Sequence, residues 1–428
     1  MSVVSKVRQS ASTPLRLVEP AAAPNRERLI QSLDRMASIG HQADGSVCRR
    51  GFSDADVAGR DQLAAWMQQV GMAVRVDAAG NLIGRLEGRE PHRPVLMTGS
   101  HLDTVPTGGR FDGVLGVLAG LEVARALADA DLQLLHPFEL VAFADEESTM
   151  VGCKGMAGTA SDDPAAYATS NGEPIADNLE RIGGHWPSLA SACRPDAAVA
   201  AFLELHVEQG AVLEQRGDAI GVVEGIVGQR RFTVRVEGQA NHAGTTPMAL
   251  RQDALAAAAR IVLAVESLAQ DHPGDPVATV GRLEVWPNAA NVVPGSVTLT
   301  VDLRDLDPQV LLALVAQLQD ALERIGLQTG CRIALEPQFD VAPTPADPIV
   351  MATIQAVAAD LGLPFSRLPS RASHDAQEIG RRWPMGMIFV PSRDGLSHSA
   401  AEFTSEAQCC AGAAVLLETL QRLDRVLP

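Results

Sequence analysis

Histidine, aspartate and glutamate side chains gather at points where strands are expected to end. His101 follows the apolar run 95–97, and Glu146 and Glu147 follow the apolar run 138–144. Because open α/β sheets place their sites at the carboxyl ends of strands, these side chains are expected to converge. Two adjacent carboxylates repel each other, and a shared cation relieves that repulsion. The pattern therefore predicts a metal site suited to hydrolysis.

Three more potential ligands occur in similar positions. Asp112 lies in a glycine-rich loop that opens a predicted helix, His206 closes the run 202–205, and His398 follows the last predicted strand. Imidazole and carboxylate groups are the ligands of zinc, manganese or cobalt at hydrolytic centres. A lone histidine at a strand end is more often structural, and a Glu-Glu pair is usually solvated. The recurrence of such residues at four strand ends nevertheless favours a metal site. If two ions share Asp112, the remaining ligands divide between them, and one carboxylate of the Glu146-Glu147 pair is not needed as a ligand and is available for catalysis.

The elements that must position these residues alternate along the chain. Strands at 95–97, 138–144 and 202–205, with a helix at 113–130, predict an α/β domain with a mostly parallel sheet. Residues 1–25 look like a loose leader. After the middle of the chain, a helix at 349–361 and a strand at 387–390 resume the α/β pattern.

Between residues 222 and 338 the pattern changes to strict apolar and polar alternation. The predicted elements are a strand (230–238), a helix (251–269), two strands (277–285 and 296–304), a helix (308–325) and a strand (331–339). This β-α-β-β-α-β order is typical of a ferredoxin-like unit. We therefore expect a catalytic α/β domain at 1–221 and 339–428, with an inserted domain at 222–338.

Composition narrows the function classes. The 428 residues include 52 acidic and 35 basic side chains, for a net charge of −17, and no dense Lys/Arg block. This balance argues against a nucleic-acid or anionic-membrane partner. The six cysteines form neither a C-x-x-C pair nor a disulfide framework, and no continuous apolar segment resembles a signal peptide or a membrane span. A cytoplasmic enzyme is the expectation.

Several longer segments make the chain recognisable. They are Gly99-Ser100-His101-Leu102-Asp103, Phe111-Asp112-Gly113, Asp145-Glu146-Glu147, Glu204-Leu205-His206-Val207-Glu208-Gln209-Gly210, Asn241-His242-Ala243-Gly244 and Ser397-His398-Ser399. From about residue 28 onward, the chain resembles the amidase, hydantoinase and carbamoylase branch of the dinuclear M20 metallohydrolases. That branch contains N-carbamoyl-L-amino acid hydrolases, β-ureidopropionases and allantoate amidohydrolases.

The resemblance implies two divalent metal ions per subunit, Zn, Mn, Co or Ni, and a general base. The first ion would be held by His101, Asp112 and His206, and the second by Asp112, Glu147 and His398. Glu146 would then accept a proton from a water that the two ions activate. A histidine at 206, where peptidases of the superfamily use an acidic ligand, favours an amidohydrolase over an aminopeptidase.

The resemblance also implies substrate contacts and a homodimer. In this family the inserted domain is a lid and a dimerisation domain, and His242, Asn291 and Arg304 match its substrate-contacting positions, with Gln209 on the catalytic side. From the residues alone, Arg304 could hold a substrate carboxylate or pair with Asp302 or Asp305. His242 could stabilise an oxyanion or be an ordinary loop residue, and Asn291 could be a turn former.

Two departures from the family concern the substrate pocket. After Glu147 the chain is several residues shorter than is typical, and residues 371–375 read Arg-Ala-Ser-His-Asp where many relatives read Gly-Ala-Gly-His-Asp. Arg371 is either a second anion contact or a partner of Asp375.

The sequence thus predicts hydrolysis of the ureido C–N bond of an N-carbamoyl-L-amino acid. Allantoate amidohydrolase and β-ureidopropionase are alternatives with the same chemistry, and a dinuclear aminopeptidase or deacylase is a different class that His206 disfavours. A non-enzymatic binding protein is disfavoured because every ligand and Glu146 are present.

Overall fold

Long apolar runs form the strands of a large mixed sheet whose central strands are parallel. The structure is a computed structural model that describes residues 22–428. The nine strands follow the order β1-β2-β4-β3-β5-β15-β6-β13, and β14 pairs with β6. Their bounds are β1 (Ala73–Val76), β2 (Leu82–Leu86), β3 (Val95–His101), β4 (Phe138–Phe143), β5 (Val199–Val207), β6 (Ile220–Ile226), β13 (Thr344–Pro345), β14 (Phe365–Ser370) and β15 (Met385–Val390). The four central strands β4, β3, β5 and β15 are paired in parallel.

Helices cover both faces of this sheet. Alternate strand residues enter different apolar clusters: Leu96 and Leu203 pack with α1, α2, α3, α9 and α11, whereas Met97 and Phe202 pack with α4 and α10. Strands buried on both faces read as continuous apolar runs, which is why they were recognisable in the sequence. The helices are α1 (Arg26–Ala37), α2 (Asp54–Gln69), α3 (Val114–Asp129), α4 (Val151–Ala157), α5 (Ile175–Arg181), α6 (Val212–Arg216), α9 (Pro348–Asp360), α10 (Asp375–Ile379) and α11 (Glu406–Val426).

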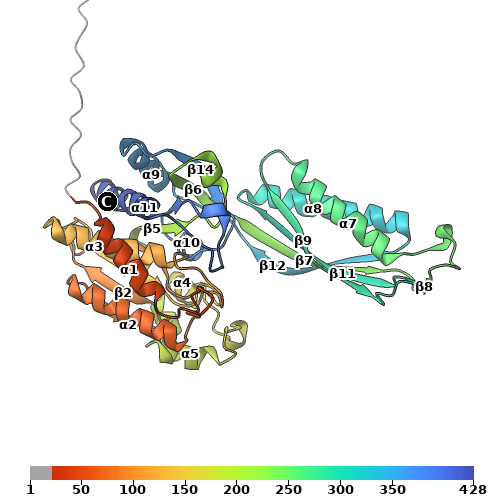
Figure 1. Ribbon diagram of the computed structural model, residues 1–428, viewed down its shortest axis with the longest axis horizontal. Helices are drawn as coiled ribbons and strands as arrows, with labels where there is room; N and C mark the ends of the chain where they lie inside the picture. The colour runs from red at the N-terminus through yellow and green to blue at the C-terminus, as the bar shows by residue number, and fades with distance from the viewer. Residues whose placement is uncertain (1–21) are drawn as a thin grey trace, which may run out of the picture.

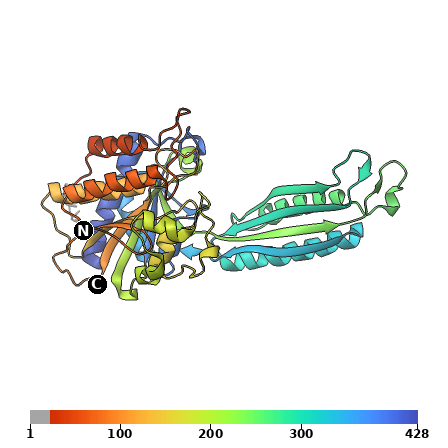
Figure 2. The ribbon, with the colours of Figure 1, turned by 90° about the horizontal axis from the view of Figure 1, so that it is seen from below.

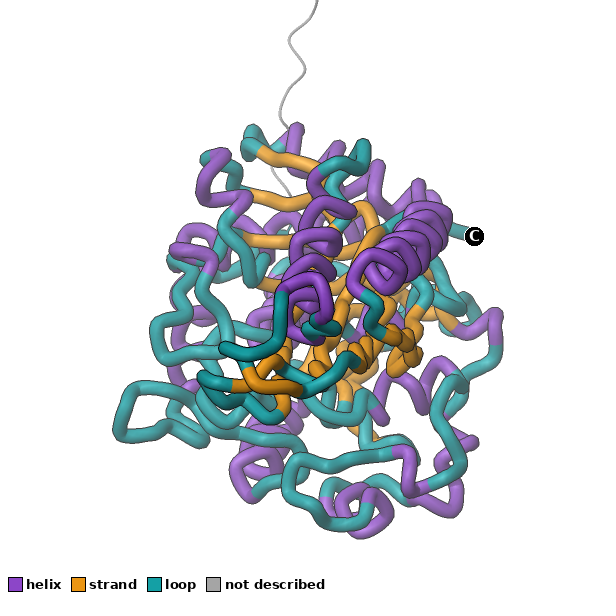
Figure 3. Tube along the Cα trace, turned by 90° about the vertical axis from the view of Figure 1, so that its right-hand side faces the viewer, coloured by secondary structure: helices purple, strands orange, loops and turns teal. Residues whose placement is uncertain are grey.

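A second, four-stranded antiparallel sheet extends away from the large sheet (Figure 1, Figure 2). Its strand order is β12-β7-β11-β9, and its elements are β7 (Gly228–Glu237), α7 (Ala254–Gln270), β9 (Val277–Trp286), β11 (Ser296–Asp305), α8 (Pro308–Thr329) and β12 (Arg332–Val341). Both helices pack on one face, as the view along the long axis shows (Figure 3). We call residues 228–341 the small unit and the rest of the described chain the large unit.

The open face of the small sheet is polar. On β7 the residues Phe232, Val234 and Val236 are buried beneath the helices, while Arg231 and Arg235 point to the opposite face. At the far end, the short strands β8 (Asn241–His242) and β10 (Val292–Val293) pair to form a tip (Figure 1). The small unit therefore presents a charged sheet face and a distant loop tip.

The predicted element order of the small unit is observed, with ends that differ by a few residues. The chain passes from the large sheet to the small sheet between β6 and β7, at Val227. Strands β3 and β5 are longer than expected, so that His101 and His206 lie within them rather than beyond their ends. Residues 1–21 of the expected leader lie outside the described residues. No helix among residues 22–428 combines the length and apolar character needed to cross a bilayer.

Candidate active site

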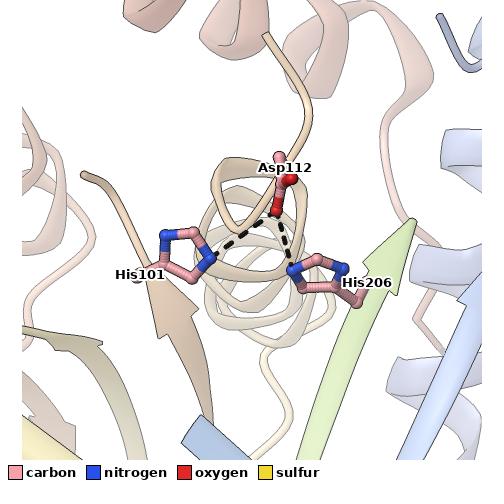
Figure 4. A group of neighbouring side chains, drawn as sticks. All are labelled: His101, Asp112 and His206. Carbon is pink, nitrogen blue, oxygen red and sulfur yellow. Dashed lines mark ion pairs between the residues drawn. The ribbon is translucent and has the colours of Figure 1, made fainter. Parts of the chain in front are cut away.

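Three predicted metal ligands meet at the carboxyl ends of β3 and β5. His101 ends β3, and His206 lies one residue before the end of the neighbouring parallel strand β5. Asp112, in the loop before α3, lies between them, with its Oδ1 3.7 Å from His101 Nε2 and 3.2 Å from His206 Nε2 (Figure 4). The donor atoms of these residues lie within 4.8 Å of one another. They form one potential ligand set.

A second potential ligand set shares the same aspartate. Asp112 Oδ2 lies 3.3 Å from His398 Nε2, which is 3.6 Å from Glu147 Oε1. The donor atoms of Asp112, Glu147 and His398 also lie within 4.8 Å of one another. One carboxylate oxygen of Asp112 therefore faces each set, the arrangement expected of a bridging ligand.

Backbone carbonyls orient the two buried imidazoles. His101 Nδ1 lies 2.9 Å from the Asp103 carbonyl oxygen, and His206 Nδ1 lies 2.9 Å from the Val207 carbonyl oxygen. A carbonyl oxygen only accepts hydrogen bonds, so each Nδ1 carries the proton and donates it. The lone pair of each neutral ring is then on Nε2, directed toward Asp112. This is the usual second contact of a metal-bound histidine.

The loop before α3 approaches His101 so closely that it needs a glycine. Gly113 has φ +66°, and a Cβ built on it would lie 2.4 Å from His101 Nε2. Only glycine adopts this conformation without strain and leaves room for the imidazole. The Asp112-Gly113 pair thus provides, in one turn, a candidate ligand and the space for the His101 imidazole.

The carboxylates of the site are crowded and buried. Glu146 Oε2 lies 3.7 Å from His101 Nε2, and Glu146 lines the same cavity of about 210 Å³ as the two ligand sets. Burial raises the pKa of Glu146 well above its ordinary value, and the nearby carboxylates of Glu147 and Asp375 raise it further. Burial, together with Asp112, raises the pKa of Glu147 to about 8. Buried carboxylates that repel one another beside imidazole groups are a donor set that fits divalent cations.

Two further carboxylates hold the loops of the site in place, and the sequence analysis did not assign them a role. Asp103 accepts hydrogen bonds from the backbone N–H groups of Glu146 (3.3 Å) and Glu147 (3.1 Å). Glu402 Oε1 accepts from the N–H groups of Phe111 (2.7 Å) and Asp112 (3.1 Å). Asp103 belongs to the same strand-end segment as His101, which was a usable signal. Glu402 lies 290 positions from Asp112, so no local pattern could have found it.

The predicted substrate contacts fall in three places. Gln209 lines the metal cavity, where its Nε2 donates to Asp112 Oδ2 (2.9 Å) and its buried Oε1 has no hydrogen-bond partner among the described residues. Arg304 and Arg371 line a second cavity. His242 and Asn291 are exposed at the far tip of the small unit, so one chain in this conformation does not bring them to the metal cavity (Figure 1).

The segment after Glu147 and the loop after β14 both reach the metal cavity. Met150 contributes to the cavity lining from the first segment, and Ser373 and His374 contribute from the second. His374 is fully buried, and its ring centroid lies 4.5 Å from that of His206. The segment after Glu147 and residues 371–375 therefore both form part of the wall around the candidate metal ligands.

Comparisons with known proteins agree with this geometry. The chain matches the profile of peptidase family M20/M25/M40 over residues 97–422. It is 40% identical to an N-carbamoyl-L-amino acid amidohydrolase from Geobacillus stearothermophilus, over 93% of this chain and 98% of the relative. It is 35% identical to an allantoate amidohydrolase from Bacillus subtilis (strain 168), over 91% of this chain and 96% of that one.

The structure is also similar to that of an amidase of the hydantoinase/carbamoylase family from Burkholderia multivorans. The TM-score is 0.88 at 38% sequence identity, over 94% of this chain and 99% of the other. With the candidate ligand sets in place, this chain is a metallohydrolase of peptidase family M20/M25/M40 and belongs to its amidase, hydantoinase and carbamoylase branch.

Proposed function

We propose that this chain hydrolyses the ureido C–N bond of an N-carbamoyl-L-amino acid to the free amino acid, carbon dioxide and ammonia. The observation that carries the proposal is the pair of ligand sets that share Asp112, with Glu146 left over beside them. Relatives named for this activity support the substrate class. Two divalent ions, Zn, Mn, Co or Ni, are the proposed cofactors.

When bound, two such ions lower the pKa of a water and polarise the ureido carbonyl. Glu146 is positioned to accept the proton of that water and to return it to the leaving nitrogen. Gln209 Oε1, a buried acceptor with no donor among residues 22–428, is suited to receive an N–H of the ureido group. These two residues supply the proton transfer and the orientation.

Arg304 is the proposed anchor for the α-carboxylate of the substrate. It shares one face of β11 with Thr300 and Asp302, as the alternation predicts, and its Nε donates to Asp302 Oδ1 (2.8 Å). The predicted alternative, an ion pair with Asp302, is thus present, but it uses only one edge of the guanidinium. The planar group has other N–H donors for a carboxylate.

We further propose that the small unit mediates a homodimer and that a second chain supplies His242 and Asn291. Large apolar side chains on the small unit support this proposal, because Leu263, Trp286 and Leu327 are 62%, 65% and 80% exposed. The distance of the tip from its own metal cavity supports contact with another chain, or a large lid movement. In either case His242 would act on the oxyanion of the tetrahedral intermediate.

An ammonia-release screen tests the proposed activity. Metal-stripped protein is loaded with Zn, Mn, Co or Ni and given N-carbamoyl-L-amino acids, N-carbamoyl-β-alanine, allantoate, dipeptides and N-acetyl amino acids. Faster turnover of N-carbamoyl-L-amino acids is the expected result. Preference for allantoate would favour the second candidate, which relatives of that name support. Release from dipeptides or N-acetyl amino acids alone would contradict a ureido substrate.

A further inference from the structure

A second cavity lies beside the metal cavity and is strongly basic. It has a volume of about 550 Å³ and runs along the open face of the small sheet to the loop after β14. Four arginines line it (Arg231, Arg282, Arg304 and Arg371), against the one carboxylate of Asp302. In a chain of net charge −17, such a concentration of positive charge indicates an anionic ligand.

The ion pairs in this cavity leave Arg371 free. Asp302 Oδ1 accepts from Arg304, and Asp302 Oδ2 accepts from Arg231 Nε (3.1 Å) and Nη2 (2.9 Å), so that both oxygens are used. Arg282 pairs with Glu284. Within residues 22–428, both carboxylate oxygens of Asp375 are buried without a hydrogen-bond partner, so the predicted alternative of an Arg371–Asp375 pair is not realised.

Arg371 and Arg304 are held side by side from different sheets. Arg304 Nη1 on β11 donates to the Arg371 carbonyl oxygen at 2.8 Å, which ties the small unit to the loop after β14. Arg371 is half-buried there. The Arg304 guanidinium is therefore held against the backbone of the loop that carries Arg371, and both side chains line the same cavity.

The same loop forms the wall between the two cavities. Arg371 lines the basic cavity, while Ser373 and His374 line the metal cavity. Two residues of extended chain span at most ~7 Å, so the linings of the two cavities approach each other at this loop. Among the described residues that line the metal cavity, Met150 alone has an apolar side chain. The side chain of a substrate bound here would therefore meet arginine side chains rather than an apolar surface.

We propose that Arg371 binds a side-chain carboxylate, and that the preferred substrates are ureido dicarboxylic acids such as N-carbamoyl-L-glutamate or N-carbamoyl-L-aspartate. This inference rests on the proposed function. Arg304 holds the α-carboxylate and Arg371 the second carboxylate, while the ureido group lies at the metal ligands.

Substrate pairs of equal shape and different charge test the proposal. For the wild-type chain, kcat/KM is expected to be higher for N-carbamoyl-L-glutamate than for N-carbamoyl-L-glutamine. Arg371→Met should lower the ratio of the two values roughly tenfold to hundredfold, because a charge-assisted hydrogen bond contributes about 1.5–3 kcal/mol. Arg371→Lys should restore part of it.

A matched control removes an arginine on the open face of the small sheet that does not line the basic cavity. Arg235 pairs with Glu336 at 3.0 Å and lies outside the basic cavity, so Arg235→Met should leave the ratio unchanged.

Binding of the second carboxylate is measured separately, by the Tm of the protein with added glutarate or butyrate. Glutarate should raise the Tm of the wild-type chain more than butyrate does, and Arg371→Met should remove that difference.

The outcomes separate the two proposals. If ureido acids are hydrolysed but the charge ratio and the glutarate effect are the same in Arg371→Met as in the wild type, the dicarboxylate inference is wrong and the proposed function stands. If no ureido acid releases ammonia under any metal, the proposed function fails, and this substrate class fails with it.

Discussion

At the scale of single residues, two adjacent glutamates are held with their carboxylates in different positions. Asp145 adopts φ +54°, and Asp103 accepts the backbone N–H groups of both Glu146 and Glu147. The Glu146 carboxylate then lies near His101, while the Glu147 carboxylate lies near His398. The backbone turn therefore separates a proposed base from a proposed ligand.

Replacing the proposed base should separate catalysis from metal binding. Glu146→Gln is expected to lower ammonia release by roughly 10²–10⁴-fold, because the amide cannot accept the proton, while the metal content of the dialysed protein is unchanged. Glu147→Gln is the matched comparison and should lose metal instead. Activity retained in Glu146→Gln would exclude this residue as the base.

At the scale of elements, two loops distant in the sequence are joined at the site. Glu402 accepts the N–H groups of Phe111 and Asp112, and its Oε2 accepts from Ser397 Oγ at 3.0 Å. Ser397 Oγ also lies 2.8 Å from Asp112 Oδ2, so its single proton is shared between the two carboxylates. One buried carboxylate thus fixes the loop before α3 against the loop that carries His398.

Removing this carboxylate should loosen the metal centre without removing a ligand. Glu402→Ala is expected to lower the affinity for the divalent ion roughly 10–100-fold, as is usual for residues that support metal ligands. The affinity is measured by titrating metal into stripped protein. Glu406→Ala provides the control, since Glu406 is 56% exposed and pairs with Arg26. Equal affinities in the two variants would argue against the supporting role.

At the scale of the whole molecule, His242 lies too far from the metal cavity of its own chain to contribute to catalysis in this conformation. His242 and its partner strand β10 lie at the end of the small unit away from the large sheet (Figure 1). A catalytic contribution therefore requires a second chain or a large movement of the small unit. Mixing two inactive variants distinguishes these possibilities.

Complementation between chains is the expected result. His242→Ala and Glu146→Gln should each be nearly inactive, and a 1:1 mixture after subunit exchange should recover up to about a quarter of wild-type activity. In a random mixture of twofold dimers, half are mixed, and each mixed dimer has one intact site. A mixture as inactive as its components, in a protein shown by light scattering to be dimeric and exchanged, would indicate that His242 acts within its own chain.

The charges of the site should make the stability of the metal-free protein depend on pH. Although burial opposes it, the contact with Asp112 raises the pKa of His206 from 6.5 to about 9, and burial raises the pKa of Glu147 from 4.5 to about 8. Both groups bind more protons in the folded than in the unfolded chain between pH 6.5 and 8, so stability falls as pH rises through that window. The lowered pKa of Asp112 affects stability only at acid pH, below its ordinary value.

Bound metal should oppose this fall in stability with rising pH. A divalent cation competes with protons for the same Nε2 and carboxylate oxygens, so added Zn²⁺ is expected to raise the Tm more at pH 8 than at pH 6.5. Thermal unfolding of stripped and reloaded protein at the two values measures the effect. A metal-free Tm that rises from pH 6.5 to pH 8 would contradict this account.

The order of elements and the identity of the candidate ligands could be read from the sequence alone. Strand and helix periodicities are local properties, so the six elements of the small unit are found within a few residues of their predicted ends. The candidate ligands follow because neighbouring parallel strands end at a common edge. The full length of β3 escaped prediction because its last residues, Thr98 to His101, are not apolar. Strand β5 extends beyond the predicted run at both ends, from Val199 to Val207.

Contacts between distant segments were decided only by the tertiary structure. No local pattern relates Glu402 to Asp112, places Arg371 beside Arg304 instead of Asp375, or puts His242 at the tip of the small unit, away from the large sheet. The sequence by itself determined which side chains form the strand-end cluster. Which loops support it, and which cations lie within reach of a substrate, depend on packing between elements that are far apart in the chain.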